Sequence, residues 1–189
     1  MIAIIDYGVG NLFSLRSSLT HLGLEAVVTA DAQTIRKADR LILPGVGAFG
    51  DAMDKLSATG LVPVIREQAA QKPLLGICLG MQLLFEKSYE YGEHGGLGFV
   101  KGEVCPLEPD LKDKSLKVPQ IGWNALHIVR DDPLFRYIRE GEYVYYVHSY
   151  YGKNCTESTL AVSDYSIPVT GVVRAFQPIC GTLRDLSFR

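Results

Sequence analysis

The chain has 189 residues, of which 47% are hydrophobic and 21% are charged, and its formal net charge is −2. These values are ordinary for a soluble globular protein with a sizeable core, and we expect residues 1–189 to form a single domain. The small charge gives no field that would attract nucleic acid or an anionic membrane, and no apolar run approaches the roughly 20 residues of a membrane-spanning helix.

The four cysteines are widely spaced, at Cys78, Cys105, Cys155 and Cys180. Cys and His residues nowhere have the spacing of metal ligands, and no Gly-x-x-x-x-Gly-Lys phosphate loop is present, so we expect neither a metal nor a cofactor. Residues 1–6 lack the basic leader of a signal peptide and have the pattern of a strand. These features predict a cytoplasmic protein in a reducing compartment.

Short apolar runs alternate with helical patterns through the first half of the chain. Predicted strands at 2–5, 26–28, 41–43 and 73–77 alternate with predicted helices at 12–22, directly after Asp31, and at 52–58, 62–71 and 79–87. Strands separated by helices pair in parallel through right-handed crossovers. We therefore predict an α/β fold with an open, mostly parallel sheet and helices on both faces, of the flavodoxin-like kind.

The pattern changes after Lys87. A glycine-rich loop at 92–98 is followed by shorter runs, of which 125–129 and 143–147 have the alternation of strands. We therefore predict an antiparallel extension in the second half of the chain. No linker, internal repeat or low-complexity tract separates the two halves.

The segment 76–82, Gly-Ile-Cys-Leu-Gly-Met-Gln, is the strongest candidate for chemistry. It places Cys78 on a sharp turn between a strand and a helix, where the helix N–H groups favour the nucleophilic thiolate. This is the pattern of a nucleophile elbow, in which Gly76 and Gly80 leave room for the tight backbone and for a substrate. A free cysteine is most often a small buried hydrophobe, but this context favours a nucleophile.

Three glycine-bearing turns support a site at this position. They follow predicted strands, at 6–10, 44–47 and 76–80. A lone turn of this kind usually serves only to reverse the chain. Ligands of open α/β sheets bind beyond the carboxyl ends of the strands, so three such turns, one of them with a cysteine, favour a binding site.

Five motifs, in order along the chain, give it a family resemblance. The cysteine segment resembles the nucleophile motif of class I (triad) glutamine amidotransferases. The segments 6–11 (Asp-Tyr-Gly-Val-Gly-Asn), 43–49, 118–124 (Val-Pro-Gln-Ile-Gly-Trp-Asn) and 146–151 narrow the match. To about residue 182 the chain resembles the glutaminase subunit of imidazole glycerol phosphate synthase, in histidine biosynthesis. The resemblance implies an enzyme that hydrolyses glutamine to glutamate and ammonia.

The resemblance also implies catalytic roles. Cys78 would attack the side-chain amide of glutamine and form a glutamyl thioester. The oxyanion that develops would be stabilised by backbone N–H groups of Leu79 and of the segment Gly45, Val46 and Gly47. Without the resemblance, this glycine-rich segment is as well explained by a structural turn.

Further residues would hold the substrate glutamine. Gln82 lies one helical turn after Cys78, on the same side of the predicted helix. His148, Ser149 and Tyr150 follow a strongly apolar predicted strand. Outside the family, such a glutamine is usually a cap or exposed to solvent, and such a histidine is often a satisfied core group.

The family docks on a cyclase subunit, a (β/α)₈ barrel that uses the ammonia, as a heterodimer. The implied contact positions are Asn11, Trp123, Asn124 and Tyr146. Clustered aromatics are usually core residues, but large rigid aromatics are also typical interface anchors. Gln120 stands where many relatives have a histidine.

The chain departs from the family pattern near residue 183. The family's general base and its carboxylate lie in a Gln-Phe-His-Pro-Glu-Lys-Ser stretch, whereas residues 183–189 are Leu-Arg-Asp-Leu-Ser-Phe-Arg. Gln177, in a similar Phe-Gln-Pro sequence, cannot act as a base. We therefore expect the domain to be incomplete at its C-terminal end, less stable than full-length relatives, and poor at hydrolysing glutamine.

Two other functions stay open. The first is a docking or scaffold subunit of the same complex without catalysis, which the missing base favours and the retained Cys78 and Gln82 oppose. The second is another cysteine-elbow amidotransferase, such as that of anthranilate synthase. The segments 118–124 and 147–151 favour the synthase subunit over this second alternative.

Overall fold

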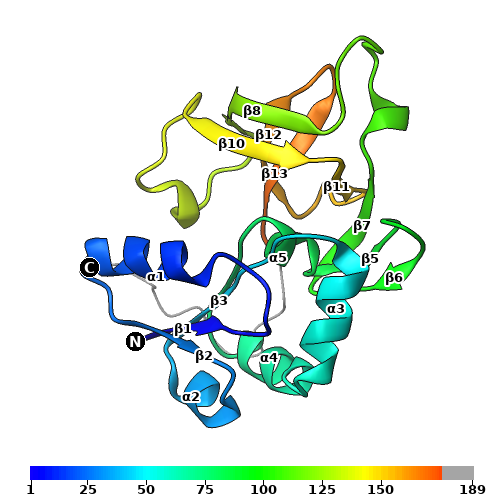
Figure 1. The fold of residues 1–189 in the computed structure, drawn as a ribbon. Coiled ribbons are helices and arrows are strands. Elements are labelled where there is room, and N and C mark those ends of the chain that lie inside the picture. Colours follow the sequence, from blue (N-terminus) through cyan, green and yellow to red (C-terminus); the bar gives the residue numbers. More distant parts are fainter. Residues whose placement is uncertain (176–189) are drawn as a thin grey trace.

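The computed structural model describes residues 1–175, and its first half is an α/β layer structure. A parallel sheet in the order β2-β1-β3-β4 lies in the lower part of the molecule (Figure 1). Its strands are β1 (Ile2–Ile5), β2 (Ala26–Thr29), β3 (Arg40–Leu43) and β4 (Leu74–Gly76). These are the four strands that the apolar runs predict.

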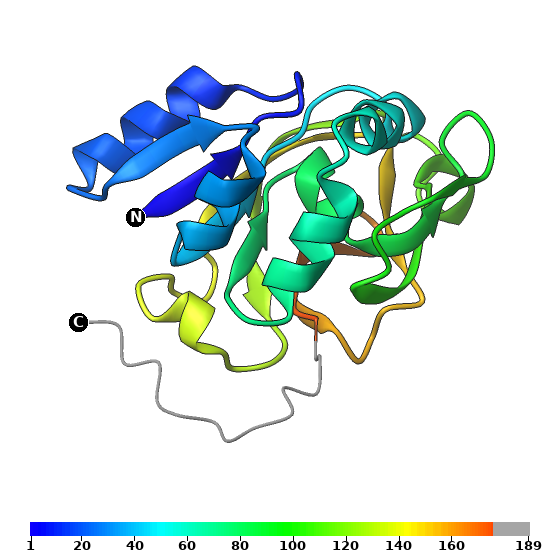
Figure 2. The same ribbon diagram turned by 90° about the horizontal axis from the view of Figure 1, so that it is seen from below.

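Helices cover both faces of this sheet, which confirms the predicted architecture (Figure 2). They are α1 (Leu12–His21), α2 (Ala32–Lys37), α3 (Phe49–Ala58) and α4 (Val62–Ala69). On one face Leu19 of α1 packs with Ile4 and Ile42. On the other face, the larger core includes buried residues of α2, α3 and α4, among them Ile35, Leu56 and Ile65. Burial of these apolar side chains is the main force that holds the layers together.

The ends of the helices follow from local chemistry. Asp31 begins α2 as predicted, because its carboxylate accepts a hydrogen bond from the Thr34 N–H at 2.7 Å. The leucine stripe of α1 ends sooner than its spacing suggests. Leu22 caps the helix C-terminus and is exposed, while Leu19 is buried.

The predicted helix 79–87 is wrong in its second half. Helix α5 (Leu79–Gln82) is a single turn, and residues 85–88 form strand β5 (Phe85–Ser88). This strand pairs in parallel with β7 (Val100–Pro106) and buries Phe85 completely. The apolar run 83–85 fits a buried strand as well as a helix, and pairing across the sheet decides between the two.

The second half of the chain is built from small sheets. Residues 85–104 pack beside α3 and share the core of the α/β sheet, while the strands after residue 120 lie mostly in the upper part of the molecule (Figure 1). The antiparallel pair β10-β8 joins Tyr143–His148 to Gln120–Ala125, and confirms the strand predicted at 143–147. The strand predicted at 125–129 is interrupted at buried Leu126, so that Ala125 ends β8 and His127–Ile128 form the short strand β9. The remaining strands are β6 (His94–Gly95), β11 (Tyr150–Lys153), β12 (Thr159–Asp164) and β13 (Pro168–Val173).

This part contains several strands that the sequence pattern did not reveal. The glycine-rich loop 92–98 includes the short strand β6, which pairs with β5. Strand β11 pairs with β7, and β12 lies between β13 and β9. None of the helices in residues 1–175 is long and apolar enough to cross a membrane.

Candidate active site

Cys78 lies on a strained turn directly beyond the end of β4. Its φ of 56° and ψ of −122° fall in a region that residues with a side chain rarely adopt. The Ile77 N–H donates to the Leu43 carbonyl at 3.0 Å and ties the turn to the end of β3. The side chain is exposed. The structure therefore has the strand–turn–helix geometry that the elbow motif predicts.

The two glycines of the motif permit close backbone approach. A Cβ on Gly80 would lie 1.9 Å from the Leu43 carbonyl oxygen, and a Cβ on Gly76 would lie 2.6 Å from the Gly80 carbonyl oxygen. Both distances are far below van der Waals contact. The protein's own backbone fills the space beside these two glycines. Close backbone packing therefore explains both glycines without a substrate.

The helix after Cys78 is too short to supply the predicted electrostatic activation in full. A helix dipole grows with the number of aligned peptide units, and α5 contains one turn. The Met81 N–H donates to the Cys78 carbonyl at 2.9 Å and closes that turn.

The three glycine-bearing turns meet at the carboxyl edge of the sheet, as predicted. The Tyr7 hydroxyl donates to the Pro44 carbonyl at 2.7 Å, and burial raises the pKa of Tyr7 to about 12. A Cβ on Gly10 would lie 3.0 Å from Pro44. The turn after β1 thus packs on the segment 44–47, which in turn packs on the Cys78 turn through Gly45.

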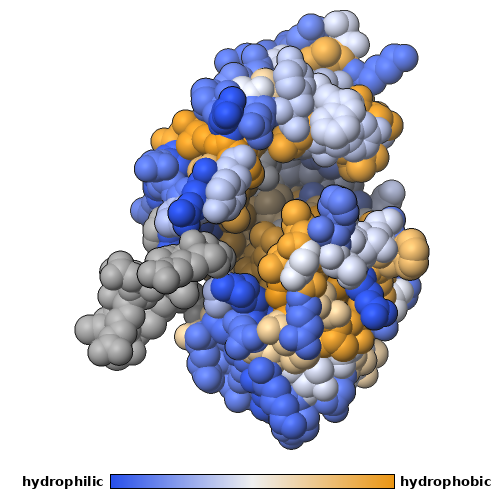
Figure 3. Space-filling model, turned by 90° about the vertical axis from the view of Figure 1, so that its left-hand side faces the viewer, coloured by the Kyte–Doolittle hydropathy of each residue, from blue (hydrophilic) through white to orange (hydrophobic). Residues whose placement is uncertain are grey.

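A cavity of about 630 Å³ opens beside Cys78. It is lined by residues of both halves of the chain, and the space-filling view shows the molecule hollowed between its two parts (Figure 3). Its lining includes most of the predicted site residues, namely Val46, Gly47, Cys78, Leu79, Gln82, His148, Ser149 and Tyr150. Gly45 is buried behind this wall.

The polar side chains of this wall are held by the β11 backbone. The Gln82 amide donates to the Tyr150 carbonyl at 3.1 Å, and His148 Nδ1 lies 2.8 Å from the same oxygen. His148 Nε2 lies 2.9 Å from Gln120 Oε1. Burial lowers the pKa of His148, and the hydrogen bond to the Tyr150 carbonyl partly opposes this.

Two carboxylates in the cavity wall were missed by the sequence analysis. They are Glu90 and Glu108. Glu90 lies in the turn after β5, and its Oε2 accepts a hydrogen bond from the Phe49 N–H at the start of α3 at 2.7 Å. No periodicity marks either residue. The signal that could have found them is chemical, because an α-amino acid brings an ammonium group that needs an anion.

The four positions proposed to contact a partner have different surroundings. Trp123 is 66% exposed, and its ring lies edge-on to Tyr145 at 5.4 Å. Asn11 caps α1 by accepting from the Ser14 N–H. Asn124 is half-buried and donates to the Asp164 carbonyl. Tyr146 lies on the inner side of β10 and donates to the Ser163 hydroxyl at 2.9 Å.

Residues 183–189, where the sequence departs from the family's base segment, lie outside the described residues 1–175. Within that range His21 ends α1, His94 packs against Gly50 of α3, and His127 bonds to Glu140 at 2.8 Å. His148 is the histidine of this range that lines the cavity. Residues 1–175 also contain no group of three or more His, Cys, Asp and Glu side chains that could hold a metal ion.

Comparison with known proteins gives the chain its family. The family "glutamine amidotransferase class-I" matches residues 3–182. The chain is 42% identical to the imidazole glycerol phosphate synthase subunit HisH of Wolinella succinogenes over 196 aligned positions, which cover 100% of this chain and 96% of that protein. It is 49% identical to the subunit of the same name from Bacillus cereus over 174 residues, which cover 92% of this chain and 81% of that protein.

Solved structures agree at the level of the fold. A glutamine amidotransferase matches with a TM-score of 0.67 at 17% identity, over 89% of this chain and 83% of that chain. A GMP synthase subunit from Thermoplasma acidophilum matches with a TM-score of 0.61 at 19% identity, over 89% of this chain and 74% of that chain.

Proposed function

The chain belongs to the class I glutamine amidotransferase family and, within it, to the HisH subunits of imidazole glycerol phosphate synthase, and on that premise we propose that Cys78 is the nucleophile of a glutaminase site. The observation that carries the proposal is the strained, exposed Cys78 at the carboxyl edge of the sheet, in the wall of a cavity of about 630 Å³. Strain of this kind concentrates at functional sites.

The proposed reaction is acyl transfer to sulfur. The Cys78 thiolate attacks the side-chain carbonyl carbon of glutamine, and the C–N bond of the tetrahedral intermediate breaks to leave a glutamyl thioester and ammonia. Water then attacks the thioester and releases glutamate and the thiolate. The intermediate's oxyanion would be stabilised by backbone N–H groups of Leu79 and of Gly45, Val46 and Gly47, of which all but the buried Gly45 line the cavity.

The polar wall suits the amino-acid end of glutamine. Gln82, His148, Ser149 and Tyr150 lie together there and would position its backbone groups. Glu90 and Glu108 are the carboxylates of this wall, and they would attract the α-ammonium group. Glu90 also accepts a hydrogen bond from the Phe49 N–H at the start of α3, shortly after the segment 44–47. Glu90 would therefore contact both the substrate's ammonium group and the helix that follows the proposed oxyanion segment.

Catalysis also needs a proton acceptor for the thiol and a donor for the departing ammonia. Residues 176–189 contain no histidine, and both ring nitrogens of His148 already face oxygen atoms. Both ring nitrogens of His148 are therefore engaged with these oxygens rather than with Cys78. We expect the 189-residue chain to hydrolyse glutamine several orders of magnitude more slowly than a complete triad.

The ammonia would pass to a cyclase partner. We propose a heterodimer with the cyclase (β/α)₈ barrel of imidazole glycerol phosphate synthase, formed through the exposed side of β8 and β10. Exposed apolar residues alternate along these strands, at Ile121, Trp123, Tyr143, Tyr145 and Val147. Among residues 1–175, the histidine that lines the cavity has both ring nitrogens engaged with other groups, which favours one alternative, a docking subunit of the same complex without glutaminase activity.

The test is glutamate release from glutamine by the complex of this chain with the cyclase and the cyclase's nucleotide ligand. Cys78→Ala is compared with wild type, and Cys105→Ala serves as the matched cysteine control because Cys105 lies outside the cavity lining. We expect slow release that Cys78→Ala abolishes and Cys105→Ala preserves. Release that survives Cys78→Ala would rule out the proposed nucleophile. No release above Cys78→Ala, with the complex intact, would support the docking subunit.

The nucleophile can also be tested without turnover. A chloroketone analogue of glutamine alkylates a thiolate that lies in a glutamine-binding cavity, and mass spectrometry locates the adduct. We expect it on Cys78, with protection by free glutamine. Modification spread equally over the cysteines, without protection, would argue against a glutamine site.

A further inference from the structure

Four polar groups form a continuous hydrogen-bonded chain from the cavity to the end of β8. His148 Nε2 lies 2.9 Å from Gln120 Oε1, Gln120 Nε2 donates to Asn124 Oδ1 at 3.0 Å, and Asn124 Nδ2 donates to the Asp164 carbonyl at 3.2 Å. Gln120 is buried, and it is the direct cross-strand partner of His148 in the pairing of β8 with β10. The chain therefore runs along the inner side of β8, the side opposite the exposed Trp123 ring, between the cavity and the Asp164 carbonyl.

The Asp164 carbonyl, at one end, fixes which group donates and which accepts in each of these hydrogen bonds. A main-chain carbonyl only accepts hydrogen bonds, so Asn124 must turn its NH₂ group toward Asp164 and its oxygen toward Gln120. Gln120 must then turn its NH₂ toward Asn124 and its oxygen toward His148. At the far side of the ring, the Tyr150 carbonyl accepts from Nδ1. All four bonds are made together only when His148 carries a proton on both ring nitrogens.

When His148 loses its Nε2 proton, the four hydrogen bonds can no longer all be made. The neutral ring keeps its proton on Nδ1, facing the Tyr150 carbonyl, and its Nε2 then needs a donor. Gln120 can supply one by turning its amide, but its oxygen then faces the oxygen of Asn124. If Asn124 turns as well, its oxygen faces the Asp164 carbonyl. The neutral state thus leaves one oxygen–oxygen contact in the chain, wherever the amides settle.

We propose that Gln120 and Asn124 are positioning residues that couple the Nε2 proton of His148 to the orientation of the Asn124 amide on the inner side of β8. Turning this amide away from the Asp164 carbonyl favours the neutral ring, and a charged ring holds the amide in place. The inference rests on the proposed function and deepens it, because it assigns residues that set the proton of a side chain in the wall of the proposed glutamine cavity. The coupling between the His148 proton and the Asn124 amide is a property of the protein without its partner.

The groups packed around the His148 ring leave the hydrogen-bonded chain as a principal influence on whether the ring is protonated. Tyr146 of its own strand lies against the ring at 5.2 Å between centroids, Tyr150 of β11 accepts from Nδ1, and Gln120 of β8 faces Nε2. The other titratable groups that line the same cavity are Cys78, Glu90, Tyr91 and Glu108. Among the described residues no charged side chain accounts for the lowered pKa of His148, which follows from burial.

The test is a titration of the free chain followed by NMR of its histidine rings, without glutamine or partner. Asn124→Leu keeps the side-chain size and removes the lock at Asp164, so Gln120 can turn freely and the neutral ring loses its penalty. We expect the pKa of His148 to fall by about 0.5–1 unit, the equivalent of one ordinary hydrogen bond, although residue 124 does not touch the ring. Gln120→Met removes the accepting oxygen itself and should lower the pKa at least as much.

Trp123→Ala is the matched control, since it changes the neighbouring residue of β8 but none of the four groups. It should leave the pKa of His148 unchanged, and the same NMR spectra verify that every variant keeps the fold of wild type. Equal His148 pKa values in wild type and Asn124→Leu would overturn the proposal, as would a neutral ring protonated on Nε2 in wild type. A chain that fails to release glutamate would count against the proposed function alone.

Discussion

At the scale of single residues, the Cys78 turn depends on Gly80 more than on the cysteine itself. A side chain at residue 80 would collide with the Leu43 carbonyl, which belongs to the backbone of a buried strand and cannot move aside cheaply. We predict that Gly80→Ala lowers the free energy of unfolding by about 3 kcal/mol or more. Gly95→Ala, where a Cβ meets nothing within 4 Å, should change it by less than about 1 kcal/mol. Urea unfolding measures both, and equal stability of the two variants would contradict the packing argument.

His148 gives the chain a specific dependence on pH. Burial holds its pKa below the ordinary 6.5, so the folded chain binds fewer protons near pH 6 than the unfolded chain does. The stability from neutral His148 is therefore fully present above pH 6.5 and is lost as the pH falls below it. We predict that melting temperature drops less between pH 7.5 and pH 5 in His148→Gln than in wild type. If the melting temperatures of the two proteins fell equally with pH, the pKa of His148 would be the same in the folded and the unfolded chain.

At the scale of elements, the first half of the fold was predictable because its signals are local. Each of β1 to β4 is a short apolar run bounded by turns or helices, and Asp31 caps α2 as its side chain suggests. Parallel pairing and two-sided helix packing follow from the alternation alone. The observed register and strand order β2-β1-β3-β4 are consistent with that alternation.

The second half was less predictable because its strands depend on distant partners. Residues 83–88 satisfy a helical pattern, yet β5 forms there because β7 and β6 supply its hydrogen bonds from farther along the chain. The same holds for β11, which pairs with β7 across more than forty residues. Non-local pairing of this kind overrides local propensity, and a single sequence does not display it.

The candidate site shows the same division. Cys78 and the segment 44–47 were predicted from glycine-bearing turns at the ends of strands, and Gln82 from the family resemblance and its spacing from Cys78. Glu90 was not, because its place in the wall arises from the fold of β5 and from its bond to the start of α3. The contact of His148 with Gln120 likewise depends on the cross-strand register of β8 and β10, which no local pattern specifies.

At the scale of the whole molecule, the cavity exists only where the two halves meet. The α/β sheet supplies Cys78 and the segment 44–47, while the upper β structure supplies His148, Ser149 and Tyr150. We therefore propose that the two halves act as one domain, since neither alone would enclose the site. This arrangement also brings the exposed strands β8 and β10 within one hydrogen-bonded chain of the cavity.

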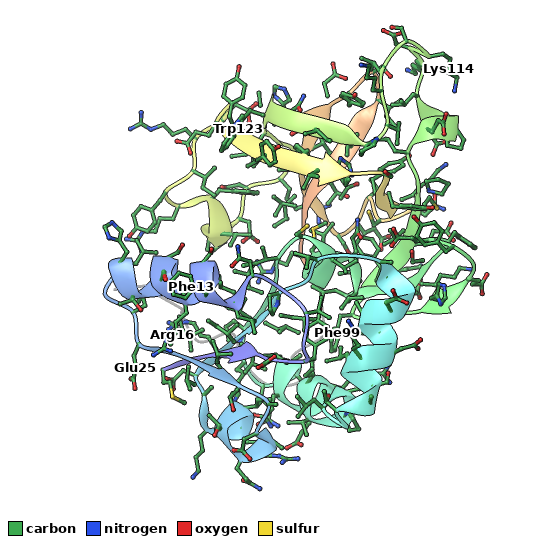
Figure 4. All side chains as sticks on the ribbon, viewed as in Figure 1. Phe13, Arg16, Glu25, Phe99, Lys114 and Trp123 are labelled. Carbon is green, nitrogen blue, oxygen red and sulfur yellow. The ribbon has the colours of Figure 1, made fainter. Side chains whose placement is uncertain are left out.

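The exposed aromatic side of β8 and β10 leads to a prediction about the partner. Figure 4 shows Trp123 at the surface of the upper part, on β8. Its ring contacts Tyr145 edge-on and is otherwise largely exposed, so its removal costs the free chain little. A buried tryptophan anchor typically contributes about 2 kcal/mol or more to binding, which is roughly 30-fold in affinity. We predict that Trp123→Ala weakens binding to the cyclase by about that factor without lowering the melting temperature.

Lys114 offers the control for this prediction, because it lies in the loop before β8, away from Trp123 (Figure 4). Its ammonium bonds only to nearby carbonyls of Glu108 and Pro109 among the described contacts, and Lys114→Ala should leave cyclase binding as it is in wild type. Calorimetric titration of the cyclase into each variant compares them directly. If Trp123→Ala bound as tightly as Lys114→Ala, this side of β8 and β10 would not be the docking face. The exposed aromatic residues would then need another explanation, since a patch of this kind is costly to leave in water.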